Sequence, residues 1–287
     1  MQIEAVETLE HRHIALAFLR SQADAGLSEN KAGWLERDDG RPGDGVLLLV
    51  DGAPVAYAGV APARAPGEWA LEVVADDLTA AVQLIPEVER RLRARGGRRL
   101  RWWTYDAGAE QLPPQFGFQP ERRLLRMAYP LPRPDSEPSF PPEVEVRGFI
   151  PGRDEGAWLE ANNAAFAGHR ENSNLDRADL RRRMEMDWFD PEGLRMAWWG
   201  ADLAGFCWTK RHGATEGEIY IIGAVPGYQG RGLGKALVLE GMRYLAAAGC
   251  TKVFLYTEGD NSRAVALYES LDFEIEAVHR SFIEDLD

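Results

Sequence analysis

Cysteine and histidine are scarce in this 287-residue chain, and it has no long hydrophobic run. The two cysteines, Cys207 and Cys250, have neither metal-site nor disulfide spacing, and the five histidines form no zinc pattern. We therefore expect no bound metal and a reducing compartment. No apolar segment is long enough to span a membrane, and the N-terminus lacks the basic flank and apolar core of a signal peptide. These absences predict a cytoplasmic protein.

Basic residues are also in the minority. The chain has 33 Lys and Arg against 46 Asp and Glu, a formal net charge of −13, which argues against nucleic acid as a partner. Its length and its 45% hydrophobic residues are sufficient for two domains, each with a core of its own. We expect a monomer that acts on a small molecule and binds neither nucleic acid nor membrane.

The order of predicted elements repeats along the chain. In the first half, hydrophobic periodicity predicts helices over residues 5–24, 28–35 and 78–95, the last kinked at Pro86, and strands over residues 46–50, 55–60, 69–74, 100–105 and 124–129. In the second half it predicts helices over residues 154–167, 179–186, 233–245 and 262–271, and strands over residues 144–146, 195–199, 203–209, 217–222, 253–256 and 273–283. A proline-rich linker, residues 130–142, separates them. We therefore predict tandem copies of one α+β domain, over residues 1–135 and 141–287.

The most informative stretch runs from Gly217 to Leu237. A buried strand is interrupted at Gly223, which suggests a bulge or the close approach of a ligand, and Pro226 ends the strand. Alternating glycines at 230, 232 and 234 then lead into a helix. Crowded backbone N–H groups at a helix N-terminus bind anions, and Arg231 and Lys235 add positive charge. The stretch predicts a phosphate or pyrophosphate site.

The spacing of these glycines fits neither a P-loop nor a dinucleotide-binding motif. A P-loop needs Ser or Thr after its lysine, whereas Ala236 follows Lys235, and a dinucleotide motif needs Gly-x-Gly-x-x-Gly. The run instead matches Gln/Arg-x-x-Gly-x-Gly/Ala, and so resembles the pyrophosphate loop of the GCN5-related N-acetyltransferases (GNATs), which bind acetyl-coenzyme A. A glycine-rich surface turn is the alternative interpretation.

Three groups near this stretch suit the formation of an amide from a thioester. Glu218 can take a proton from an ammonium, the backbone N–H of Ala224 can bind the thioester oxygen, and the hydroxyl of Tyr268 can protonate the leaving sulfur. Each has a simpler interpretation: Glu218 as a solvated carboxylate at a strand edge, Tyr268 as a core residue.

Segments across the second half resemble the tandem-domain mycothiol synthase family of GNATs. The matching segments are residues 162–171, 188–193, 203–210, 217–234 and 255–261. The resemblance implies two tandem GNAT domains, each a mixed, mostly antiparallel sheet flanked by helices. It also implies acetyl transfer from acetyl-coenzyme A, without a metal, to the cysteinyl amine of cysteinyl-glucosaminyl-inositol, which gives mycothiol.

The same resemblance implies a set of binding residues. Those expected to hold coenzyme A are Ile222, Gly223, Ala224, Gln229, Gly230, Arg231, Gly232, Leu233, Gly234, Lys235, Asn261, Ser262, Arg263, Ala264, Val265 and Ala266. Those expected to contact the acceptor are Glu29, Glu171, Lys210, Glu218 and Tyr256. Surface charge is the alternative interpretation of Lys210 and Glu171.

The first copy lacks the glycine loop. After residues 71–74 it continues Ala75-Asp76-Asp77-Leu78-Thr79, with two carboxylates where a pyrophosphate needs N–H groups. We expect this degenerate domain not to bind coenzyme A well. Two other functions stay open for the whole chain: acetylation of a different amine, such as a protein N-terminus or an aminoglycoside, and a coenzyme A-binding sensor without turnover.

Overall fold

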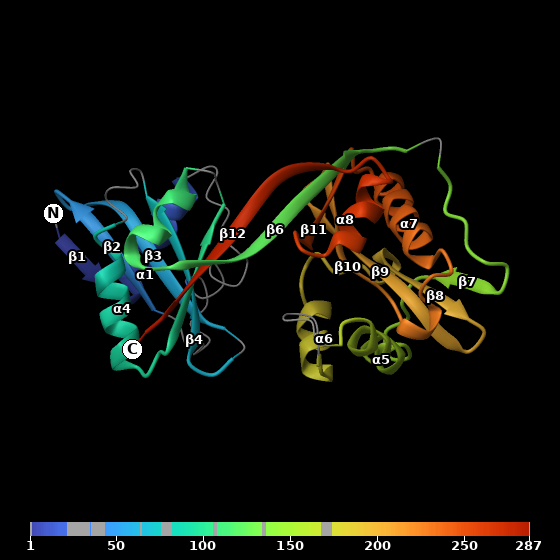
Figure 1. Ribbon diagram of the computed structural model, residues 1–287, viewed down its shortest axis with the longest axis horizontal. Helices are drawn as coiled ribbons and strands as arrows, with labels where there is room; N and C mark the ends of the chain where they lie inside the picture. Colours follow the sequence, from blue (N-terminus) through green and yellow to red (C-terminus); the bar gives the residue numbers. More distant parts are fainter. Residues whose placement is uncertain are drawn as a thin grey trace. The chain divides into compact units, whose positions relative to one another are not determined.

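The chain forms two compact units (Figure 1). The computed structural model describes residues 2–21, 35, 44–63, 65–75, 82–105, 108–133, 136–167 and 174–286. Unit 1 comprises Met1–Leu124 and Ala277–Asp287, and unit 2 comprises Leu125–Glu276. No helix in the described ranges combines the length and the apolar character needed to cross a membrane.

Unit 1 is a mixed sheet with helices. Its elements are β1 (Gln2–Ala5), α1 (Leu9–Ser21), β2 (Asp44–Val50), β3 (Ala53–Pro62), β4 (Glu68–Ala75), α4 (Ile85–Ala94), β5 (Arg99–Thr104), the first part of β6 (Gln119–Pro130) and the last part of β12 (Glu274–Asp285). The strand order includes β1-β2-β3-β4-β5-β12. Strands β4 and β5 are parallel, and the other pairs in this series are antiparallel.

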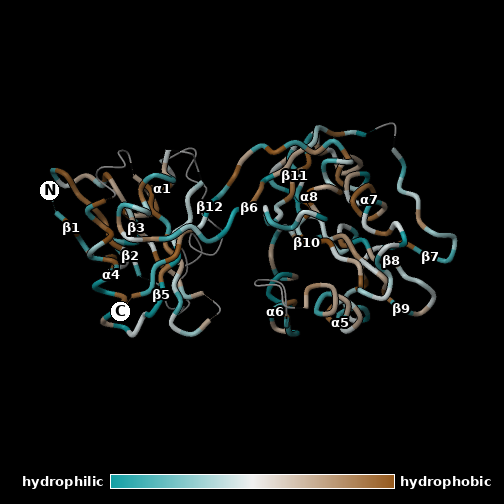
Figure 2. Tube along the Cα trace, viewed as in Figure 1, coloured by the Kyte–Doolittle hydropathy of each residue, from teal (hydrophilic) through white to brown (hydrophobic). Residues whose placement is uncertain are grey.

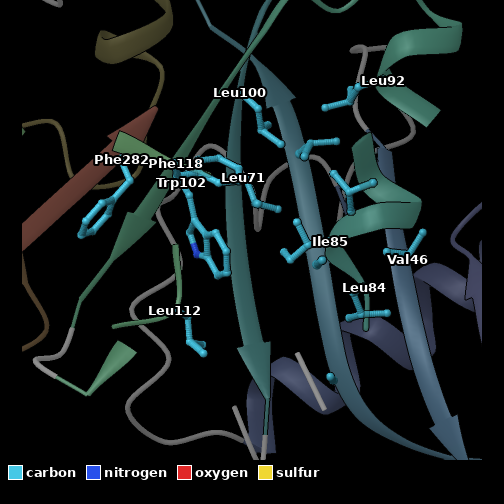
Figure 3. Packing of buried hydrophobic residues seen from close by; sticks show 14 of the residues in the cluster. Val46, Leu71, Leu84, Ile85, Leu92, Leu100, Trp102, Leu112, Phe118 and Phe282 are labelled. Carbon is cyan, nitrogen blue, oxygen red and sulfur yellow. The ribbon is translucent and has the colours of Figure 1, made fainter. Parts of the chain in front are cut away.

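The core of unit 1 follows from the period of two in its strands. Val46 and Leu48 of β2 pack into one cluster with Ile85 of α4, whereas Leu47 of the same strand packs into a second cluster with Phe18 of α1. Figure 3 shows the first cluster, which also contains Leu71, Leu84, Leu92, Leu100, Trp102, Phe118 and Phe282. Burial of each large apolar side chain contributes roughly 1.5–3 kcal/mol. The two clusters hold helices on opposite faces of the sheet.

Two helix predictions in unit 1 need correction, and one falls outside the described residues. Of the helix predicted over residues 78–95, residues 78–81 lie outside the described residues. Helix α4 begins at Ile85, so Pro86 lies in its first turn, where a missing N–H costs nothing, and the predicted kink is wrong. The helix predicted over residues 5–24 begins at Leu9, after the short strand β1. Of residues 28–35, only Leu35 is described, as a buried helical residue.

The C-terminal strand does not follow the predicted domain boundary at residues 135–141, which assigned it to the second domain. Residues Arg280 to Asp285 of β12 pair antiparallel with β5, and the segment from Ala277 belongs to unit 1. The N-terminal unit is therefore built from two separate parts of the chain, and a fragment of residues 1–135 would lack one of its strands.

Unit 2 repeats the arrangement. Its elements are the second part of β6, β7 (Val144–Arg147), α5 (Glu155–Ala165), α6 (Arg177–Met184), β8 (Leu194–Trp199), β9 (Asp202–His212), β10 (Glu216–Ala224), α7 (Leu233–Ala247), β11 (Lys252–Glu258) and α8 (Ser262–Glu269). The strand order is β6-β11-β10-β9-β8-β7, with β10 and β11 parallel. The helices and strands predicted for this half are present, with ends shifted by a few residues.

Helices cover both faces of the sheet of unit 2. On one face, Trp158 of α5 packs edge-on against Trp208 of β9, with ring centroids 5.1 Å apart. On the other face, Gly241 of α7 lies so close to Cys207 that an added Cβ would be 2.5 Å from its sulfur. Figure 2 shows α7 mostly white to brown, in keeping with its burial, and α6 mostly teal. Strands β9 and β10 are thus fixed between helices at the centre of the unit.

Candidate active site

The candidate site lies at a fork, which is the point where the parallel strands β10 and β11 separate. Strand β10 pairs with β11 only from Glu216–Lys252 to Ile219–Leu255, but it continues alongside β9 as far as Ala224. The pairing with β9 shifts register between Ile219 and Ile221, so the bulge lies at Tyr220. Of the two alternatives predicted for Gly223, the bulge is wrong, and the close approach of a ligand stays a prediction.

The backbone of Ala224 faces the open side of the fork. The N–H of Val225 donates to the carbonyl of Ala204 at 2.9 Å, towards β9. Successive amides of a strand point to opposite edges, so the N–H of Ala224 points away from β9. Gly223 has a different role, because a Cβ at this position would lie 3.0 Å from the Cβ of Ala165. The N–H of Ala224 is therefore not used by the pairing with β9, and its role as an oxyanion donor stays a prediction.

Glycines shape the turn that follows β10. Gly230 and Gly232 have φ values of 77° and 85°, in the left-handed region that favours glycine. Gly232 is the N-cap of α7 and offers no side chain to bond its first amides. The first turn of a 15-residue helix thus presents free N–H groups, as an anion site requires.

Two cations border this helix start. The guanidinium of Arg231 lies 5.0 Å from the ring centroid of Trp199 and 5.7 Å from that of Tyr228, which fixes it by cation–π contacts. The hydroxyl of Tyr228 donates to Asp202 at 2.8 Å, which holds the ring in turn. Lys235 is exposed on the first turn of α7. Arg231 and Lys235 thus place two positive charges at the start of α7, although the chain is acidic overall.

Hydrogen bonds join the turn to the start of α8. Gln229 donates from its side-chain amide to the carbonyl of Ala224 at 3.0 Å and accepts from Arg263 at 3.2 Å. Asn261 caps α8 by accepting from the N–H of Ala264 at 3.1 Å. The structure therefore brings together the three segments expected to hold coenzyme A: residues 222–224, 229–235 and 261–266.

Glu218 lies on the paired part of β10, just before the fork. The residue is only 8% exposed, and its Oε2 is 2.7 Å from Nε2 of His212. Its neighbours across the sheet are Lys210 on β9 and Phe254 on β11. The alternative interpretation of a solvated carboxylate at a strand edge is wrong, because β10 is an interior strand.

Lys210 is also buried, with 5% of its surface exposed. Its Nζ lies 4.8 Å from the ring centroid of Trp188 and 5.8 Å from that of Tyr220. Aromatic faces stabilise an ammonium that has left water. The alternative interpretation of Lys210 as surface charge is wrong.

The two predicted tyrosines differ in exposure. Tyr256, on β11, is 40% exposed. The pKa of its phenol is raised, chiefly by burial, with an opposing effect of Arg126 and a further increase from the charge of Glu218. The phenol is therefore within electrostatic range of Glu218. Tyr268, on α8, is 6% exposed, and burial raises its pKa well above the usual value of 10. Tyr268 therefore stays protonated at neutral pH, the form that a proton donor needs.

Two predicted acceptor-binding residues, Glu29 and Glu171, lie outside the described residues, and their roles stay predictions. His212 is not among the predicted site residues, because the strand predicted over residues 203–209 stops short of it, whereas β9 continues to His212. A signal was present: Lys210 and His212 alternate on one strand as Glu216 and Glu218 do on the next, so that the four share a face of a hairpin.

Known proteins resemble this chain in sequence and in fold. Residues 157–273 match the acetyltransferase (GNAT) family. A mycothiol acetyltransferase of Streptomyces scabiei is 44% identical over 66% of this chain and 64% of its own length. That of Thermobispora bispora is 37% identical over 91% of this chain and 90% of its own length.

Solved structures show the same fold. A GCN5-related N-acetyltransferase from Sphaerobacter thermophilus has a TM-score of 0.75 at 20% identity, over 99% of this chain and 96% of its own. A tandem GNAT protein from the clavulanic acid biosynthesis pathway has a TM-score of 0.71 at 16% identity, over 100% and 99%. The predicted α+β fold of tandem GNAT domains is confirmed. The chain belongs to the acetyltransferase (GNAT) family and, within it, to the mycothiol acetyltransferases.

Proposed function

We propose that this chain transfers the acetyl group of acetyl-coenzyme A to the cysteinyl amine of cysteinyl-glucosaminyl-inositol and thereby forms mycothiol. The relatives named mycothiol acetyltransferase support the reaction. The observation that carries the proposal is that buried Glu218 and an amide-lined helix start stand at the same fork, in one unit. The helix start would bind an anionic acyl carrier, and the carboxylate of Glu218 would bind and deprotonate a basic amine.

Each step has a group in unit 2 suited to it. The first turn of α7 and Arg231 would bind the pyrophosphate of coenzyme A. Glu218 would take a proton from the acceptor ammonium, and the free amine would attack the thioester carbonyl carbon.

The N–H of Ala224 would bind the oxygen on which negative charge develops. The C–S bond then breaks, and Tyr268 would give its proton to the departing thiolate and regain one from solvent. The nitrogen of the new amide would lose its remaining extra proton to solvent, as would Glu218, so that one proton is released per turnover.

The acceptor side of the fork is polar and charged. Lys210 can donate to hydroxyl oxygens of a polyhydroxylated sugar, and the exposed Tyr256 can donate or accept. Glu218 attracts the ammonium that it deprotonates. Such a combination suits an amine carried on a sugar-like body, as in cysteinyl-glucosaminyl-inositol.

The test is a product assay with the full-length protein. It would be mixed with acetyl-coenzyme A and, separately, with the cysteinyl pseudodisaccharide, a cysteinyl peptide and an aminoglycoside, and acetylated products would be quantified by mass spectrometry. We expect turnover with the pseudodisaccharide at least about 100-fold above the other amines in kcat/KM, since unpaired polar groups in a site reject the wrong substrate strongly. Preferred turnover of a peptide or aminoglycoside, or binding of acetyl-coenzyme A without turnover, would overturn the proposal.

A further inference from the structure

His212 forms a short hydrogen bond with the buried carboxylate of Glu218. The distance from Nε2 to Oε2 is 2.7 Å, and 35% of the histidine side chain is exposed against 11% of that of the glutamate. An ionised carboxylate has no proton to donate, so the bond requires a proton on Nε2. This fixes the tautomer of neutral His212 wherever Glu218 is ionised.

We infer that His212 is a positioning residue for Glu218. By donating to Oε2 it fixes the rotation of the carboxylate and leaves Oε1 as the oxygen that accepts the proton of the acceptor amine. A general base acts efficiently when a further group orients it. The inference rests on the proposed acetyl transfer, because it assigns His212 a role in that reaction.

The hairpin of β9 and β10 fixes the pair. His212 lies opposite Glu216, and Lys210 lies opposite Glu218, so that His212 and Glu218 are diagonal neighbours on one face. The ring of His212 packs against Phe254, with centroids 5.2 Å apart. Backbone register and ring packing thus hold the imidazole before any substrate binds.

The other charged groups on this face have different partners. Glu216 lies 3.2 Å from the ammonium of Lys252 and 3.7 Å from the guanidinium of Arg126. The guanidinium of Arg126 also covers the ring of Phe254 at 4.0 Å, and Lys210 lies against Trp188. Within the described residues, His212 is the side chain seen to bond the carboxylate of Glu218. Two neighbouring carboxylates of β10 are therefore held in two different ways.

Two substitutions of His212 separate positioning from folding. Phenylalanine keeps a ring against Phe254 but has no donor, whereas glutamine places an N–H near the position of Nε2 and does not titrate. We expect His212→Phe to lower kcat about tenfold or more, part of the 10²–10⁴ that general base catalysis supplies, with the KM for acetyl-coenzyme A unchanged. We expect His212→Gln to retain kcat within about threefold, because the donated hydrogen bond is restored.

A double-mutant cycle tests whether His212 acts through Glu218. In a Glu218→Ala background, His212→Phe should lower kcat no further, since its target is gone. Glu216→Gln serves as the matched control and should leave kcat within about twofold, because its carboxylate is a partly exposed ion-pair partner of Lys252 and Arg126. Wild-type kcat in His212→Phe, failure of glutamine to restore it, or a further loss in the double variant would each overturn the inference.

A measurement without substrate keeps this result apart from the proposed function. Long-range ¹H–¹⁵N spectra of the free protein at pH 8 should show a proton on Nε2 of His212 in the wild type. An Nε2 without a proton would overturn the inference, whichever amine the enzyme acetylates. Failure of the pseudodisaccharide to react would overturn the proposed function alone, and the kinetic arms would then use the amine that does react.

Discussion

Leu71 of β4 lies opposite Trp102 of β5 in the last parallel pair between these strands, and beyond it β4 stays paired with β3 and β5 with β12. In unit 2, Ile219 lies opposite Leu255 in the last parallel pair between β10 and β11. Both ladders have four pairs. The duplicated domain has thus kept the strand fork in both copies, although only the second copy has the glycines that follow it.

We expect the full-length protein to bind one acetyl-coenzyme A per chain. Residues 75–79 supply two carboxylates and no glycine after the fork of unit 1, so neither backbone crowding nor positive charge favours a pyrophosphate there. Isothermal titration should give a stoichiometry near one. The whole chain is needed, because β12 completes the sheet of unit 1. A second site with micromolar affinity would contradict the prediction.

Replacing Glu218 by alanine should lower kcat by about 10²-fold or more, because the acceptor amine would lose its base. The affinity for acetyl-coenzyme A should change little, since Glu218 lies on the paired part of β10, before the predicted pyrophosphate site. Steady-state kinetics and titration with acetyl-coenzyme A measure the two quantities. An equal loss of affinity would show that Glu218 binds the carrier and does not act as the base.

Gly232→Ala should weaken acetyl-coenzyme A binding and destabilise the start of α7. Alanine at a φ of 85° costs about 1–2 kcal/mol, and relief of that strain would rotate the amides of the first turn. Gly227→Ala is the matched control: the structure has open space for its Cβ, and its φ is not among the positive values. Thermal melts and the KM for acetyl-coenzyme A should change in the first variant only. Equal behaviour of the two variants would contradict the backbone argument.

Tyr268→Phe should lower kcat about tenfold or more, because the thiolate would leave without a proton donor. Since burial raises the pKa of this phenol above 10, its deprotonation cannot cause a loss of activity between pH 7 and 10. The pH–rate profiles of the wild type and the variant should therefore have parallel alkaline limbs below pH 10. An alkaline fall that disappears in Tyr268→Phe would contradict this assignment.

Local patterns in the sequence predicted most of the elements. Short apolar runs in β2 and β9, and the glycines before α7, are short-range signals of buried strands and of a helix start. The same local signals predicted that Glu218 and the anion site lie on adjacent elements, because the strand and the helix that carry them are close in sequence. The predictions that succeeded depend on backbone geometry within about 20 residues.

The features that were missed depend on pairing between distant residues. The hydrophobic pattern of β12 fits a strand in either unit, and only its partner β5 decides that Arg280 to Asp285 join unit 1. The bulge at Tyr220 likewise arises from register with β9, so that the nearby Gly223 misled the prediction. The length of β9 was missed as well. The strand continues three residues beyond the predicted end, and the last of these, His212, is the side chain that bonds Glu218.

The stability of the protein should depend on pH through Glu284. In unit 1, burial and the carboxylate of Glu89 raise the pKa of Glu284 to about 7, against a smaller opposing effect of Arg93. The folded state therefore favours protonated Glu284. As the pH rises from the unfolded-state value near 4.5 through 7, the unfolded chain gives up its proton first, and the protein loses stability.

Glu284→Gln removes this loss, since glutamine stays neutral. We expect the variant to melt at a higher temperature than the wild type at pH 8 and at about the same temperature at pH 4, with the difference growing between pH 5 and 8. Glu87→Gln on α4 is the control: a hydrogen bond from Arg90 lowers the pKa of Glu87, so this variant should not be stabilised at pH 8. Melting curves recorded across this range decide the matter, because a difference independent of pH would mean that the substitution acts through packing and not through the buried charge.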